Sequence, residues 1–111
     1  MKKAAISLLL FIFVAVSFAQ SGVRPLSGFV PNEETAVKIA EAVLIPIYGE
    51  KKIAEEKPFH ASRKGEVWTV TGTLYCSDGK GGRTTQNCAG GVAMVEISKS
   101  DARILSMGHG K

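Results

Sequence analysis

The sequence predicts an α+β domain in which one main N-terminal helix packs on a curled antiparallel sheet of about four strands. In the first half of the chain, apolar residues recur at three- and four-residue steps, which is typical of an amphipathic helix. In the second half, apolar and polar residues alternate, which is typical of strands with one buried face. Turn residues separate these strand-like segments, as in an antiparallel meander. The apolar face of the helix therefore has only the sheet to pack against.

Residues 1–19 have the layout of a secretory signal peptide. Two lysines form a basic start, residues 4–18 are almost wholly apolar, and small residues stand three and one positions before the bond between Ala19 and Gln20. The apolar run is shorter than the roughly 20 residues that span a bilayer. We expect cleavage at this bond, a periplasmic or secreted protein, and no stable membrane insertion afterwards. An uncleaved membrane anchor is the alternative.

Cleavage there leaves 92 of the 111 residues, which is enough for one small domain with one modest core. We expect residues 20–30 to form a flexible leader, because they contain Gly, Ser and Pro without an apolar period, and residues 31–111 to form the single domain. The whole chain carries 14 Lys and Arg against 10 Asp and Glu, without a basic block or an aromatic-interleaved basic stripe. Nucleic acid is therefore not an expected partner.

The main helix is predicted to begin after Asn32, whose side chain can cap the free amides, and the two glutamates that follow suit the positive end of the helix dipole. Pro46 has no amide hydrogen for the carbonyl four residues earlier, so the helix should kink or end there. Gly49 is a natural stop, and residues 50–57 suit one or two further helical turns. The apolar face of the main helix consists of Ala36, Ile39, Ala40, Val43, Leu44 and Ile47.

Four segments have strand composition and are separated by turns or loops: residues 59–63, 67–75, 91–99 and 103–107. In the second segment, Trp68, Val70 and Leu74 share one face, whereas three threonines share the other. This alternation predicts a sheet with one buried face and one face in contact with solvent.

Residues 77–87 are polar and Gly-rich, and they are predicted to form a loop held at its neck by Cys76 and Cys88. An even number of cysteines in an exported protein favours a disulfide, which should stabilise the fold by roughly 3 kcal/mol for a loop of this size. A metal site or a reactive thiol is the alternative. A metal would need further ligands, and His60 and His109 do not have the spacing of a zinc site.

No assembled set of catalytic groups is visible in the sequence. His60 and His109 have no evident carboxylate partner, and the adjacent glutamates Glu33–Glu34 and Glu55–Glu56 would not face each other on a helix. There is no G-x-S-x-G turn, and the glycines of residues 78–82 lack the G-K-[ST] ending of a phosphate-binding loop. We expect no catalytic residues, no cofactor and no metal, and thus a protein that binds rather than reacts.

Several segments together carry a family resemblance: residues 28–32, the helix motif A-x-x-I-A-E-A-x-x-x-P-x-Y-G at 36–49, residues 57–59 and 68–74, Gly90-Gly91-Val92, residues 96–99 and the final His109-Gly110-Lys111. They resemble the immunity-protein family with a nuclear-transport-factor-2-like fold that is found in bacterial polymorphic toxin systems. The resemblance covers about residues 28–111 and implies a small nuclear-transport-factor-2-like or cystatin-like layout. It also implies a protein that binds and neutralises a cognate toxin or effector, in the periplasm if the signal peptide is cleaved, and it brings no active-site residues with it.

The loop with the two cysteines departs from the family pattern, and it is the candidate partner interface through Asp78, Lys80 and Arg83. Loops on a rigid sheet often carry specificity. Trp68 would join this interface if its side chain were exposed, and a core position is the alternative. For the loop itself, a hairpin tip that contacts only solvent is the alternative. The sequence does not predict the oligomeric state.

Two other functions remain open from the sequence alone. The first is a small-ligand-binding protein or enzyme that uses the concave face of the sheet. Convergence of Tyr48, His60 or His109 in a real cavity would support it. The second is a periplasmic protease-inhibitor-like module, because a helix over a short antiparallel sheet also occurs in such proteins.

Overall fold

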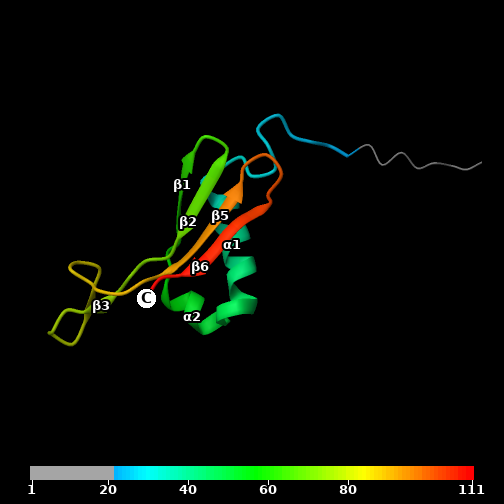
Figure 1. The fold of residues 1–111 in the computed structure, drawn as a ribbon. Coiled ribbons are helices and arrows are strands. Elements are labelled where there is room, and N and C mark those ends of the chain that lie inside the picture. The colour runs from blue at the N-terminus through cyan, green and yellow to red at the C-terminus, as the bar shows by residue number, and fades with distance from the viewer. Residues whose placement is uncertain (1–21) are drawn as a thin grey trace, which may run out of the picture.

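The computed structural model describes residues 22–111 and confirms the predicted α+β architecture (Figure 1). The predicted signal peptide, residues 1–19, lies outside the described residues. Two consecutive helices, α1 (Glu33–Tyr48) and α2 (Glu50–Glu55), precede all the strands. The main sheet has the order β1-β2-β5-β6 and is antiparallel throughout. Its strands are β1 (His60–Lys64), β2 (Val67–Thr71), β5 (Ala93–Ser98) and β6 (Ile104–His109).

The main sheet is not strongly curled, which differs from the expected curl around the helix. Its strands are only five or six residues long, and the register shifts at one place, between Glu96 and Ile97 of β5. Strong curling of a sheet is usually produced by bulges or glycine kinks repeated along several strands. Short strands with a single irregularity therefore curl little, and α1 lies across one face of the sheet (Figure 1).

Local signals account for the limits of α1. The Asn32 side chain accepts a hydrogen bond from the Thr35 amide at 2.9 Å, and so satisfies one of the free N–H groups of the first turn. The helix runs two residues past Pro46, because the missing N–H of Pro46 costs only one hydrogen bond in the last turn. Gly49 then ends it with a φ of 91°, which a residue with a side chain rarely adopts.

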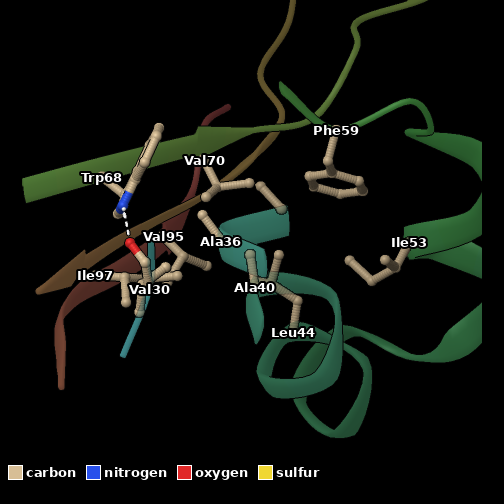
Figure 2. Close-up of a cluster of buried hydrophobic side chains, with 11 residues drawn as sticks. Val30, Ala36, Ala40, Leu44, Ile53, Phe59, Trp68, Val70, Val95 and Ile97 are labelled. Atoms are coloured by element: carbon tan, nitrogen blue, oxygen red, sulfur yellow. Dashed lines mark hydrogen bonds between the residues drawn. The ribbon is translucent and has the colours of Figure 1, made fainter. Parts of the chain in front are cut away.

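The core lies between α1 and the sheet, where α1 contacts β1, β2 and β5 (Figure 2). Trp68 is buried, and its indole Nε1 donates a hydrogen bond of 2.8 Å to the carbonyl of Val30. A buried Trp is stabilised when its N–H finds such a partner. The buried hydrophobic residues are Val30, Ala36, Ala40, Leu44, Ile53, Phe59, Trp68, Val70, Ala93, Val95 and Ile97.

The packed part of the chain begins a few residues before the expected domain start at residue 31. Val30 is fully buried and its amide donates to the Lys99 carbonyl at 3.0 Å, while the Phe29 amide donates to the Ser100 carbonyl at 3.1 Å. Gly28 has a φ of 82°, and a Cβ there would overlap the Lys99 carbonyl oxygen. Residues 28–30 therefore lie against the turn between β5 and β6.

Strand β2 ends at Thr71, four residues earlier than predicted. A Cβ on the next residue, Gly72, would lie 3.0 Å from the Cβ of Glu56, and the Thr73 amide donates to the Glu56 carbonyl at 2.7 Å. The chain therefore leaves the ladder to pack on the end of α2, and Leu74 is half-buried rather than part of the core. Within residues 22–111, no helix is long and apolar enough to cross a bilayer.

Candidate functional site

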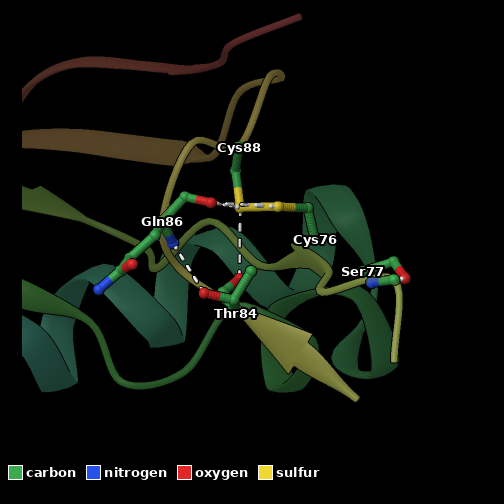
Figure 3. Close-up of a disulfide and its surroundings, with 6 residues drawn as sticks. Cys76, Ser77, Thr84, Gln86 and Cys88 are labelled. Atoms are coloured by element: carbon green, nitrogen blue, oxygen red, sulfur yellow. Dashed lines mark hydrogen bonds between the residues drawn. A yellow bond between two sulfur atoms is a disulfide. The ribbon is translucent and has the colours of Figure 1, made fainter. Parts of the chain in front are cut away.

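A hairpin projects from the main body of the domain, on the side away from the turn between β5 and β6 (Figure 1). We call residues 76–88 the arm. It contains the short antiparallel pair β3 (Cys76–Ser77) and β4 (Arg83–Thr84), where the sequence predicted only a loop. The structure joins Cys76 to Cys88 in the expected disulfide, with their Cα atoms 5.5 Å apart (Figure 3). The covalent bond closes the neck of the arm.

The tip of the arm is organised by Asp78. Its Oδ1 atom accepts hydrogen bonds from the amides of Lys80 at 2.7 Å and Gly82 at 3.0 Å, and its own amide donates to the Gly82 carbonyl at 3.2 Å. Gly79 and Gly81 have φ values of 73° and 83°, which allow this tight turn. The Asp78 carboxylate is thus engaged within the arm, and the exposed Lys80 is left without a carboxylate partner within residues 22–111.

The base of the arm joins the body through Tyr75 and Arg83. The Arg83 guanidinium lies 4.1 Å from the centre of the Tyr75 ring, and the Tyr75 hydroxyl donates to the Lys57 carbonyl at 2.8 Å. An aromatic face attracts a cation and favours one orientation of the guanidinium. Tyr75 therefore places the charge of Arg83 next to the end of α2.

A hollow of about 300 Å³ lies between the base of the arm and α2, and we call it the basal groove. Its charged members are the exposed Lys52, Glu55 and Arg83 together with the buried Glu56. The complete lining is Lys52, Glu55, Glu56, Thr73, Leu74, Tyr75, Arg83, Gly91 and Val92.

Glu56 is only 7% exposed and connects three parts of the fold. Its Oε1 atom accepts a hydrogen bond from the Ala93 amide at 2.6 Å, and its Oε2 atom lies 3.2 Å from Nε2 of His109. The His109 ring packs against the Tyr48 ring with 5.5 Å between centroids. A buried carboxylate is tolerated when its oxygens are paired in this way, so Glu56 joins α2 to the start of β5 and the end of β6.

The two Gly-containing motifs of the family resemblance meet beside this cluster. The Gly110 amide donates to the Val92 carbonyl at 3.0 Å, and a Cβ on Gly91 would overlap the backbone of Gly110. Glycine is needed where two backbones approach this closely. The G-G-V and H-G-K motifs therefore have a structural role in closing this corner of the sheet.

Two of the three residues considered for a ligand or catalytic site come together at this corner. Tyr48 and His109 do converge, and Glu56 supplies the carboxylate that the sequence analysis did not assign to His109. His60, at the start of β1, is exposed and does not take part in the hydrogen bond or the ring contact that join these residues. Neither Tyr48 nor His109 lines the basal groove. Through the Ala93 amide and the His109 ring, Glu56 joins α2 to β5 and β6.

A second, wider hollow of about 720 Å³ runs along the first half of α1 beside Phe59. Its carboxylates are largely engaged: Glu33 accepts from the Ala61 amide at 3.2 Å, and Glu34 pairs with Lys38 at 2.9 Å. The hydrogen bond from Lys38, and then its charge, lower the pKa of the Glu34 carboxyl below its usual value. This hollow is a shallow surface on α1 beside Phe59, and its carboxylates have partners in the chain.

The structure places the predicted interface residues in two different environments. Asp78, Lys80 and Arg83 are exposed on the arm, whereas Trp68 is 8% exposed and belongs to the core. Trp68 is not part of a free surface, because it belongs to the buried core cluster and its N–H is bonded to the Val30 carbonyl (Figure 2).

Sequence reasoning did not identify Lys52 and Tyr75 as neighbours of Arg83, since only the fold brings α2 beside the arm. It also did not identify Glu56, for which the sequence offers only a weak signal. Glu56 follows the last residue of α2 and precedes Lys57-Pro58, where a helix cannot continue.

Comparison with known proteins gives a consistent result. Residues 35–111 match the sequence model of a family described as NTF2 fold immunity protein. The chain is 33% identical over 94 residues to the "Uncharacterized protein YhhH" of Escherichia coli (strain K12), a match that covers 85% of this chain and 67% of that protein. It is 30% identical over 82 residues to the "Uncharacterized protein YbbC" of the same organism, covering 74% of this chain and 60% of YbbC. No solved structure matches the chain.

Proposed function

This chain belongs to the NTF2 fold immunity protein family, and on that premise we propose that it is exported and neutralises a cognate toxin in the periplasm by binding it. Membership of the family implies toxin neutralisation, and immunity proteins are typically binders without enzymatic activity. The proposal adds the compartment, the cognate partner and the surface that binds it.

Export is supported by two features of the chain. Residues 1–19 have the charge and apolar pattern of a cleavable signal peptide. The disulfide between Cys76 and Cys88 is consistent with an oxidising compartment such as the periplasm. Both features would be unusual together in a cytosolic protein.

The arm is the proposed toxin-binding surface. None of the buried core residues lies in residues 76–88, so the arm is not needed to fill the core. Its shape is nevertheless fixed, by the disulfide at the neck and by Asp78 at the tip. A surface that is ordered before binding loses less conformational entropy in the complex, which favours affinity. This projecting, covalently closed arm on an immunity-family domain is the observation that carries the proposal.

The proposal is tested in two steps, with the product of the gene adjacent to this one as the candidate toxin. The exported chain should co-purify with that toxin at a ratio of one to one from a periplasmic extract, and it should protect cells that meet the toxin from outside. A chain that lacks residues 2–19 should fail to protect. Absence of a complex would contradict the toxin-binding function, and full protection without export would contradict the periplasmic site.

A further inference from the structure

We propose that the basal groove receives an acidic side chain of the toxin, held between Lys52 of α2 and Arg83 of the arm. This inference rests on the proposed function and deepens it, because it names the chemistry that the arm recognises. It requires that both cations be available, that the groove have no carboxylate that already neutralises them, and that its walls suit a side chain.

Both cations are available. Within residues 22–111 the carboxylates that lie within 4 Å of a basic side chain are Glu34 beside Lys38, Glu41 beside Lys57 and Glu56 beside His109, so neither Lys52 nor Arg83 has a carboxylate within 4 Å. No side-chain hydrogen bond of the described residues uses either group. The Arg83 guanidinium lies over the Tyr75 ring, and its N–H groups, which are the groups that bind a carboxylate, have no hydrogen-bond partner within residues 22–111.

The two glutamates of the groove differ in whether their charge can repel an anionic guest. Glu56 is buried, and its two carboxylate oxygens are already engaged by the Ala93 amide and by His109. Glu55 is exposed at the rim and has no ion pair within residues 22–111. The exposed charges of the groove are therefore two cations and one anion, which favours an anionic guest and makes Glu55 the residue that opposes it.

The walls and size of the groove favour a protein side chain. Leu74, Val92 and the Tyr75 ring supply apolar surface that can cover the methylene groups of a Glu or Asp. Its volume of about 300 Å³ is at the small end of the range for ligand sites, so it suits one or two side chains rather than a folded element. Tyr and Arg are also the residue types that most often dominate the binding energy of protein interfaces. The chain has no basic stripe that would follow a nucleic-acid backbone.

The test uses a set of charge variants of this protein. For each variant, the dissociation constant of its complex with the candidate toxin is measured. Lys52→Glu and Arg83→Glu should each raise Kd by at least ~10-fold, whereas Glu55→Gln should lower it by about 2- to 5-fold. Arg63→Glu and Lys64→Glu are matched controls, because both residues are exposed cations on β1 outside the groove, and they should leave Kd within about twofold. Circular dichroism confirms that each variant is folded.

A charge-swap experiment then identifies the guest. Single Asp→Lys and Glu→Lys variants of the toxin should include one that restores binding to Arg83→Glu. Unchanged affinity in both groove variants, with strong binding of the wild type, would overturn the inference and leave the toxin-binding function in place. If the wild type does not bind the toxin at all, the proposed function and this inference both fail.

Discussion

Removal of the disulfide should release the arm while the core stays folded. The perturbation is the double substitution Cys76→Ser and Cys88→Ser. The two cysteines are 12 positions apart, and closure of a loop of that length removes about 3 kcal/mol of chain entropy from the unfolded state. That full amount is lost only if the arm remains ordered in the native state of the variant.

The structure indicates that the arm will not remain ordered. Its only ladder is the two-residue pair β3–β4, and residues 76–88 contribute no buried hydrophobic side chain. Without the covalent bond, the native state gains nearly the same loop freedom as the unfolded state. The free energy of unfolding should therefore fall by about 1 kcal/mol, well short of the 3 kcal/mol that loop closure alone would give.

Two measurements separate the arm from the core. Trp68 is the single tryptophan of the chain and is buried, so its fluorescence in a urea titration reports unfolding of the core. Amide hydrogen exchange of residues 76–88 reports opening of the arm. A loss of 3 kcal/mol or more in the urea titration would refute the reasoning, because the arm and the core would then fold as one unit. Unchanged exchange in residues 76–88 would refute it as well.

Three further substitutions test the interior contacts. Glu56→Ala should lower the free energy of unfolding by about 3 kcal/mol, because it leaves a buried β5 amide and a histidine without their partner, whereas Glu55→Ala, at an exposed neighbour, should cost less than about 0.5 kcal/mol. Gly91→Ala should lower the free energy of unfolding by about 2 kcal/mol, because the new Cβ would overlap the backbone of Gly110. Gly22→Ala is the control and should be neutral, because its Cβ would meet no atom within 4 Å. Equal effects of the two substitutions in urea titrations would contradict this prediction. Trp68→Phe should lower the free energy of unfolding by about 1–2 kcal/mol, because the hydrogen bond from the indole to the Val30 carbonyl is lost. Denaturation monitored by circular dichroism measures this change, and an unchanged free energy would contradict a stabilising role for the indole N–H.

The helix and the number of main-sheet strands could be predicted because their signals are local. A capping side chain at Asn32, a stop at Gly49 and two apolar periods are each contained in a few neighbouring residues. The disulfide pairing was also determined by the sequence, once a bond was expected, because the chain has only Cys76 and Cys88. The match of residues 35–111 to the immunity family likewise agrees with the resemblance drawn from short motifs.

The features that were not predicted depend on contacts between distant parts of the chain. The end of β2 at Thr71 is set by the close approach of Gly72 to Glu56, which no local pattern reveals. The pairing of Glu56 with His109 and the position of Lys52 near Arg83 need the whole fold. Periodicity identifies buried faces, but it does not indicate which polar groups the fold brings together.

We propose above that this domain neutralises a toxin through a surface held in shape by one covalent bond. Titration calorimetry of the oxidised mature chain, and of the Cys76→Ser/Cys88→Ser variant, with the neighbouring toxin tests it most directly. We expect one binding site per chain for the oxidised protein and an affinity at least ~10-fold weaker for the variant, whose core is intact. Equal affinity for the two forms, or no heat of binding for the oxidised chain, would contradict it.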